Sequence, residues 1–479
     1  MISKVLAEIL KYDLPCIISD QQYAFIKQRQ ILDCALLANE CIDSRIKSGI
    51  PGVICKIDFE KAFSHVSWDF NDDVLAKMGF GELWRKWIQV CISDTHISVL
   101  INDLAHTKLT IGKGSTQGDP LSPFIFIIVA EALHLLLQSG KEHGHIGGFA
   151  MSQNGIVITH LQFSDDTLVF LDDSTDQMNY LRYYLLGFEM LSDVHINFSK
   201  CSFFGVAVAS NLENMAAMLA YFVPGKVLAL TKPDSSDTKK GYHYVGWKNC
   251  RKPLKAERPG IKSVKSMNKA LISKCWWRFN KEKKALRRNC IVSKYDSTLL
   301  DRENKNPKPG NKCEVWKNIF AYLKTFKQCS RFRLGDGATI RFWEDTWLDD
   351  QPLYLVFPHI YSITYTKKWT VQKCVESLFN GGPWNIGLDR RLSQTQMQEV
   401  SALIVLFENL SLGSEQDTLV WSVDKSGLFI VKSAYSWFEK EHPLYHTSEP
   451  EIRKGHWARL YYDQLGYAFR NVGSVYFLA

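Results

Sequence analysis

Two strand-like segments joined by a short, doubly acidic turn constrain the fold of this chain more than any other feature. Ile156–Phe163 and Thr167–Leu171 are apolar and β-branched, and only Ser164, Asp165 and Asp166 separate them. Segments joined this closely pair as an antiparallel hairpin, because parallel pairing needs a long crossover. The sequence therefore predicts a sheet with two carboxylates at one of its turns.

Helix and strand patterns alternate around this hairpin. Helical spacing of apolar residues predicts helices over Val5–Leu10, Ile31–Arg45, Val74–Val90, Pro123–Leu137 and Asn179–Ser192. Short apolar runs predict strands over Val53–Ile57, Ile97–Ile101 and Val194–Phe204. In the second helix, the acidic side chains of Asp33, Glu40 and Asp43 are expected to face solvent. The order predicts an α+β fold in which helices pack on one face of an antiparallel sheet.

The net charge of +8 is distributed unevenly along the chain. Residues 1–223 carry −9, residues 224–343 carry +21 and residues 344–479 carry −4. The basic segment is a candidate for contact with nucleic acid, because Lys and Arg neutralise phosphates. The alternative is a solvated or irregular linker.

Three aromatic residues lie within a predicted helix of the basic segment, Ile261–Phe279. Trp276, Trp277 and Phe279 are candidates for stacking on bases, which would make the segment an RNA-binding module. Their helical spacing with Leu271 favours a packed core instead.

Composition argues against secretion, a membrane span and a zinc or disulfide framework. No apolar stretch reaches the roughly 20 residues that a span needs, and the N-terminus lacks a signal-peptide pattern. The 12 cysteines lie far apart without a C-x-x-C pair, so we expect buried free thiols and no zinc.

Three carboxylates are placed where strands end. Asp58 follows the strand Val53–Ile57, and Asp165 and Asp166 follow Phe163 and Ser164. If the strands are neighbours, the carboxylates converge, and such a cluster suits Mg²⁺ because a hard cation offsets their repulsion. Two ions held this way promote in-line phosphoryl transfer. For the Asp-Asp pair alone, ordinary turn chemistry is an equal alternative.

Four segments resemble, in order, the successive motifs of reverse transcriptases: Lys56–Phe63, Gln117–Pro123, Phe163–Asp166 and Ile196–Lys200. The resemblance is greatest to the enzymes of plant LINE-type (non-LTR) retrotransposons. It extends to the fingers-like Ala24–Asp33 and, downstream, to Met267–Leu271, Gly335–Gly337, Arg341–Trp343 and Val431–Tyr435. It covers most of residues 1–440 and implies an RNA-directed DNA polymerase that uses an RNA template, a DNA primer and dNTPs.

The resemblance implies roles in catalysis and metal binding for five residues. Asp58, Asp165 and Asp166 would bind two Mg²⁺ ions. The Phe59 carbonyl would help to hold the nucleotide-bound ion. Lys200 is a candidate proton donor to pyrophosphate, with a solvated surface lysine as the alternative.

The resemblance also implies a nucleotide site. Phe63 would be the steric gate against a ribose 2′-hydroxyl, and Gln117 and Gly118 would contact the incoming nucleotide. Arg29 would reach the phosphates. The alternatives are a core phenylalanine, a plain turn before the helix and a surface arginine.

The implied architecture is a palm-type antiparallel sheet with packed helices and partial fingers, a basic, mainly helical segment, and a small mixed C-terminal region. The expected parts are 1–223 (fingers and palm), 224–312 (basic linker and helices), 313–440 (retrotransposon C-terminal region) and 441–479 (divergent tail). We expect the fingers to be truncated and the thumb to be missing, because Tyr242–Trp247 resembles sequence beyond a thumb.

Three departures from the family pattern bear on activity. Family members usually have Gly where Gln28 stands, Asp where Ser64 stands and Arg where Thr116 stands. The two readings are an active reverse transcriptase and an inactive remnant with residual nucleic-acid binding through its basic segment. A nuclear or cytoplasmic location is expected.

Overall fold

The computed structural model describes twelve stretches of the chain: residues 2–93, 96–102, 104–110, 112–114, 118–198, 200–207, 215, 226–229, 263–295, 319–379, 392–408 and 410–439. These residues divide into two compact units. The first unit holds the described residues up to 229 together with 284–295. The second unit holds residues 263–283 and the described residues from 319 to 439.

A five-stranded sheet forms the centre of the first unit, with the order β6-β7-β1-β8-β9. The strands are β1 (Gly52–Ile57), β6 (His160–Phe163), β7 (Asp166–Asp172), β8 (Ser202–Val206) and β9 (Lys226–Ala229). Strand β1 pairs antiparallel with both β7 and β8, and β6 pairs antiparallel with β7, which confirms the predicted hairpin. The β8–β9 pair is parallel, so the sheet is mixed rather than wholly antiparallel.

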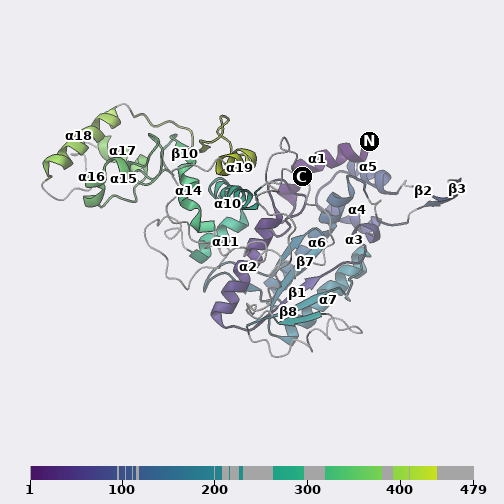
Figure 1. Cartoon of the computed structure of the whole chain (residues 1–479). Helices are drawn as coiled ribbons and strands as arrows, with labels where there is room; N and C mark the ends of the chain where they lie inside the picture. Colours follow the sequence, from purple (N-terminus) through teal and green to yellow (C-terminus); the bar gives the residue numbers. More distant parts are fainter. Residues whose placement is uncertain are drawn as a thin grey trace, which may run out of the picture. The chain divides into compact units, whose positions relative to one another are not determined.

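Helices cover both faces of this sheet, and the prediction that they pack on one face is wrong. Helices α6 (Ser122–Glu142) and α7 (Thr175–Ser192) pack on one face, and α2 (Ile31–Ser48) lies on the other (Figure 1). Every residue of β1 is consequently buried. The apolar run Val53–Ile57, interrupted only by Lys56, is typical of a strand buried on both faces.

Three further helices of the first unit share a third apolar core with the start of α6. They are α1 (Ile2–Ile17), α4 (Trp68–Lys77) and α5 (Glu82–Ser93), and the short helix α3 (Ala62–His65) follows β1. The predicted single helix Val74–Val90 is wrong, because Gly79 has φ +90° and separates α4 from α5. A left-handed residue ends a helix, and glycine adopts that conformation at little cost.

Helix α6 is long and apolar enough to span a membrane by length and composition. Within the described part of the chain it alone meets that test, and 67% of its apolar window is buried. Its side chains pack on β1, on α7 and on the third core. Burial of this extent is what the central helix of a globular unit shows.

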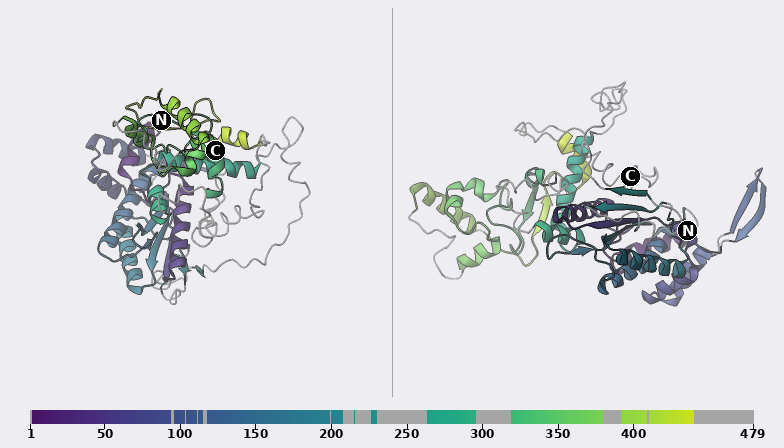
Figure 2. Two further views of the ribbon diagram at one scale, coloured as in Figure 1. Left: turned by 90° about the vertical axis from the view of Figure 1, so that its left-hand side faces the viewer. Right: turned by 90° about the horizontal axis from the view of Figure 1, so that it is seen from below.

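Two short hairpins complete the first unit. Strands β2 (His96–Ile101) and β3 (Leu104–Thr110) pair with each other and extend away from the central sheet (Figures 1 and 2). Strands β4 (Phe149–Ala150) and β5 (Val157–Ile158) form the second hairpin. The segment expected as a strand over Val194–Phe204 is a strand only in β8, and the residues before it form a bridge and a turn.

Helix α11 (Leu286–Tyr295), from the basic segment, packs on α2 through buried ion pairs. Arg287 contacts Asp33 at 2.8 Å and Lys294 contacts Glu40 at 2.8 Å, with all four side chains at most 7% exposed. The expectation that Asp33 and Glu40 face solvent is therefore wrong. The sequence pattern of α2 shows polar positions, but it does not show that a distant helix supplies their counter-charges.

The second unit contains Trp276, Trp277 and Phe279, the three aromatic candidates for base stacking, and all three are core residues. Helix α10 (Val264–Lys281) packs against α19 (Val431–Glu439), and Trp276 lies edge-on to Phe320. Trp276 and Trp277 are 3% and 7% exposed, which confirms the packed-core interpretation. Stacking of these side chains on bases is excluded in this conformation.

The rest of the second unit is mixed helix and strand. Its elements are α14 (Leu323–Gln328), β10 (Ser330–Arg333), α15 (Leu353–Val356), α16 (Pro358–Ile363), α17 (Val371–Phe379), α18 (Gln394–Glu408) and β11 (Thr418–Trp421). Strand β10 pairs antiparallel with β11. The predicted segment 224–312 is thus divided between the two units, since α10 lies in the second and α11 in the first. The boundaries near residues 223 and 440 lie outside the described residues and stay predictions.

Candidate active site

The central position of β1 brings the predicted carboxylates to one edge of the sheet. In the β1–β7 register, Ile57 lies opposite Thr167, so one further step sets Asp58 opposite Asp166. Side chains directly opposite on antiparallel strands have Cβ atoms about 5 Å apart. The condition for convergence, that these strands are neighbours, is confirmed.

The β6–β7 turn differs in one respect from the prediction. Asp166 pairs with Phe163 and begins β7, so the turn itself consists of Ser164 and Asp165. Ser164 has φ +58°, which is in the left-handed region. Asp165 thus lies at the tip, whereas Asp166 is a buried strand residue, 9% exposed.

A lysine that the sequence reasoning named only as part of a motif is the direct partner of Asp166. The Lys56 ammonium lies 3.1 Å from the Asp166 carboxylate, and both side chains are buried. Burial raises the pKa of Asp166 to about 6, Lys56 opposes this shift, and the charges of Asp165 and Asp58 add to it. The sequence did contain a signal for this contact. Lys56 lies two residues before Asp58, and alternate residues of a strand share a face, so this spacing places Lys56 on the face of β1 that carries Asp58.

Asp58 belongs to the same electrostatic group. Burial raises its pKa, Lys200 and Lys56 lower it, and Asp165 raises it. The charge of Asp165 thus acts on both Asp58 and Asp166, as expected of carboxylates at neighbouring strand ends. Lys200 is exposed and near Asp58, as a proton donor at this site would be.

The segment before Lys200 also orients Phe59. Phe59 bridges Ile196 in antiparallel fashion, and the flanking amides of Asn197 and Glu60 donate to the carbonyls of Asp58 (2.8 Å) and His195 (2.7 Å). Phe59 and Ile196 are thus a non-hydrogen-bonded pair, so the Phe59 carbonyl is directed away from Ile196. The Phe59 ring packs in the core against Phe188.

The donor atoms at this edge fit a hard divalent cation. Three carboxylates and a main-chain carbonyl supply the oxygen ligands that Mg²⁺ prefers. Within the described residues, no three His, Cys, Asp or Glu side chains are yet arranged around one point as ligands. The carboxylates therefore have the right chemistry and neighbouring positions, and their side chains would turn to share an ion.

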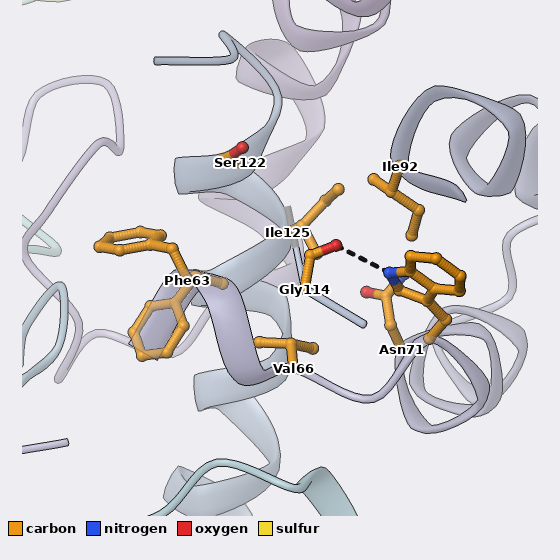
Figure 3. A pocket seen from close by; sticks show the side chains of 9 residues that line it. Phe63, Val66, Asn71, Ile92, Gly114, Ser122 and Ile125 are labelled. Carbon is orange, nitrogen blue, oxygen red and sulfur yellow. Dashed lines mark hydrogen bonds between the residues drawn. The ribbon is translucent and has the colours of Figure 1, made fainter. Parts of the chain in front are cut away.

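Phe63 and the glycine-containing loop meet at a small pocket. Phe63 packs against Phe126, 5.0 Å between ring centres, and lines the pocket with Gly114 and Ser122 (Figure 3). The pocket volume of about 10 Å³ is about the least that a single water needs. In this conformation Phe63 is partly core and cannot yet face a nucleotide in that space.

Gly114 fixes the start of the loop. It has φ +73°, its amide donates to the Val66 carbonyl (2.8 Å), and its carbonyl accepts from the Trp68 indole (2.7 Å; Figure 3). A Cβ there would lie 2.1 Å from the Ser64 carbonyl oxygen. Gly118 also has a positive φ, +91°, and Gln117 and Thr116 lie outside the described residues.

Arg29 makes contacts that the sequence did not predict. Its guanidinium donates to the carbonyls of Ile18 and Gln22, both at 2.8 Å, and its side chain is 14% exposed. Burial lowers its pKa. Here Arg29 holds the chain between α1 and α2, and its contact with nucleotide phosphates stays a prediction. Gln28 has φ +71°, so the backbone keeps the conformation for which relatives use glycine.

A family model matches the part of the chain that holds these strands and carboxylates. The model for reverse transcriptase (RNA-dependent DNA polymerase) matches residues 1–249, just over half of the chain. The chain belongs to the reverse transcriptase family. The match includes α2, the central sheet and all three carboxylates.

The curated proteins that are similar to this chain match only part of its length and part of their own. A protein of Arabidopsis thaliana, named provisionally as a ribonuclease H protein, is 30% identical over 207 residues, which are 42% of this chain and 32% of that protein. The Pol polyprotein of the type-1 retrotransposable element R2 from Popillia japonica is 32% identical over 140 residues, 29% of this chain and 19% of that protein. The chain thus spans about a third of the first relative and a fifth of the second.

Solved structures give only a weak likeness. A telomerase from Candida albicans, solved with a fragment of telomeric RNA, has 14% identity and a TM-score of 0.32 and covers 42% of this chain and 33% of that one. A telomerase from Candida tropicalis reaches a TM-score of 0.34. Both scores are too low to establish a shared fold.

Proposed function

We propose that the chain is the reverse transcriptase domain of a non-LTR retrotransposon, with a palm-type fold. It would join deoxynucleotides to the 3′ end of a DNA primer on an RNA template. This proposal depends on one observation. Asp58 and the Asp165–Asp166 pair lie at neighbouring strand ends of the central sheet, which helices cover on both faces. The family match and the R2 relative support the same reaction class.

In this proposal each residue has a defined task. Asp58, Asp165 and Asp166, with the Phe59 carbonyl, would hold two Mg²⁺ ions, which supply charge stabilisation for in-line phosphoryl transfer. Lys56 stays beside Asp166 and limits the repulsion among the carboxylates. Lys200, exposed next to Asp58, would deliver a proton to the leaving pyrophosphate.

The nucleotide would lie between the carboxylate edge and the loop that begins at Gly114. Phe63 would exclude a ribose 2′-hydroxyl once its ring turns from Phe126, and Gln117 and Gly118 would contact the nucleotide. The basic segment is a weaker candidate for nucleic-acid binding than its charge suggests, because Arg287 and Lys294 form internal ion pairs.

Primer extension tests the proposal. Purified protein is incubated with an RNA template, an annealed DNA primer, dNTPs and Mg²⁺. We expect extension by the unmodified chain, loss of extension in Asp165→Asn and full extension in Asp73→Asn, an exposed aspartate of α4 that serves as the matched control. Absence of extension by the unmodified chain would refute the proposal and leave the inactive remnant.

A further inference from the structure

We propose that Gln22 is a positioning residue that holds the Ser164–Asp165 turn, and with it the carboxylates of Asp165 and Asp166. The inference rests on the proposed function, because it assigns a task within the same site. Gln22 lies in the chain between α1 and α2, 142 residues before Ser164. Its side chain does not touch the carboxylates and acts through the backbone of the turn.

The contacts of Gln22 account for both main-chain polar groups of Ser164. The Gln22 side-chain oxygen accepts the Ser164 amide at 2.9 Å and the Ala24 amide at 3.0 Å. The Gln22 side-chain nitrogen donates to the Ser164 carbonyl at 3.3 Å. Gln22 is 1% exposed, so water cannot easily replace these bonds. One buried side chain therefore holds the turn residue from both sides.

The main chain around Gln22 is itself docked on the sheet. The Tyr23 amide donates to the Gln162 carbonyl at 2.9 Å, and the Gln162 amide donates to the Gln21 carbonyl at 2.8 Å. Gln22 thus bridges Gln162 in parallel at the outer edge of β6. This added strand segment sets the Gln22 side chain at the end of β6, where the turn begins.

A second layer of buried contacts fixes the segment that contains Gln22. Arg29 donates to the Gln22 carbonyl at 2.8 Å and also to the carbonyls of Ile18 and Ser19. Glu131, from α6, accepts the Ser19 amide at 3.1 Å. The contacts of Arg29 and Glu131 link the rigid helix α6 to the turn through Gln22.

The conformation of Ser164 explains why the turn needs an external support. Its φ of +58° is unfavourable for a residue with a Cβ, and two-residue hairpin turns with such a conformation favour glycine or asparagine. Such a conformation persists only where its surroundings determine it. The two hydrogen bonds from Gln22 to Ser164 meet this requirement without a glycine.

Amide hydrogen exchange tests the inference without substrate. In Gln22→Leu, which keeps the size but loses the hydrogen bonds, we expect the Ser164 amide to exchange about tenfold faster or more. Exchange at Val169, in the middle of β7, should stay unchanged. Gln138→Leu, at the surface of α6, is the matched control and should change neither amide.

Two further variants distinguish a role of Gln22 in positioning the Ser164–Asp165 turn from a general loosening of the sheet. Gln22→Glu with an ionised carboxylate keeps the accepted bonds but cannot donate to the Ser164 carbonyl, and its negative charge repels that carbonyl oxygen. The turn is then loosened from one side, so faster exchange confined to Ser164 supports the inference and unchanged exchange overturns it. This variant decides the question if Gln22→Leu also loosens Val169. In Gln22→Leu/Ser164→Gly, glycine adopts the positive φ unaided, and slower exchange than in Gln22→Leu is expected.

Primer extension adds a readout of the site. We expect Gln22→Glu to lower kcat and to raise the Mg²⁺ concentration for half-maximal activity about tenfold, with an unchanged KM for primer–template. If the unmodified chain extends primers and neither exchange nor Mg²⁺ dependence changes in the Gln22 variants, the inference is wrong. If the unmodified chain is inactive but exchange changes as expected, the proposed function fails and the positioning role stands.

Discussion

Acidification should destabilise the first unit through a buried pair of histidines. His134 of α6 and His160 of β6 contact each other at 2.8 Å between ring nitrogens, and they are 6% and 0% exposed. Two neutral rings can form this bond, with one nitrogen donating and the other accepting. Burial lowers the pKa of His134 to about 4, and burial lowers the pKa of His160 well below its usual value, with His134 adding to that effect.

The size of the effect follows from the difference between the folded and unfolded pKa. An unfolded histidine titrates near pH 6.5, so below that pH the unfolded chain binds more protons than the folded one. The contribution is complete above about pH 6.5 and is lost as the pH falls toward 4. For His134 alone the loss at pH 5 is about 2 kcal/mol, and His160 acts in the same direction.

Urea unfolding of the full chain at about pH 7.5 and pH 5, followed by circular dichroism, measures this loss. Between these pH values the unmodified protein should lose about 2 kcal/mol more than His134→Gln, because the opposing gain from the raised pKa of Asp166 is common to both proteins. His143→Gln, at an exposed position, should behave like the unmodified chain. Equal losses in the unmodified protein and in His134→Gln would refute the reasoning.

Three further predictions concern stability and are measured by the same urea titrations. Gly114→Ala should lower the free energy of unfolding by more than about 2 kcal/mol because of its φ and the blocked Cβ position, whereas Gly81→Ala, with open space, should change it little. Asp33→Asn should cost about 3–5 kcal/mol because it removes the buried carboxylate that Arg287 contacts, and a double variant with Arg287→Met should recover part of this. Gln28→Gly should raise the free energy of unfolding by about 1 kcal/mol by removing left-handed strain, and an unchanged or lower value would contradict that explanation.

The sequence was most informative where local pattern and chemistry coincide. The hairpin around Asp165 and Asp166 was predictable because its two strands are adjacent in the chain, and strand β1 was predictable from its apolar run. That β1 and β7 are neighbours was only a condition of the predicted carboxylate cluster, and the structure meets that condition. The sequence did not predict that Lys56 contacts Asp166, because a lysine in a strand is usually expected to be exposed.

Contacts between distant segments were not predictable from pattern alone. Nothing local to α2 shows that Asp33 and Glu40 are buried, because their partners come from α11, more than 250 residues later. The prediction of a one-sided sheet was wrong for a different reason, because the apolar run of β1 was a local signal of burial on both faces that was not used. In the sequence, Gln22 is an ordinary polar residue of a loop. Only the structure shows that its side chain contacts Ser164.

The ion pairs of α11 also bear on when the first unit can fold during synthesis. Asp33 and Glu40 leave the ribosome early, but Arg287 and Lys294 are translated only after all of α10, which belongs to the other unit. Until then α2 presents two carboxylates that cannot be buried without cost. A nascent chain that has reached the end of the sheet therefore still lacks α11, and this stabilising helix arrives only after part of the second unit has been made.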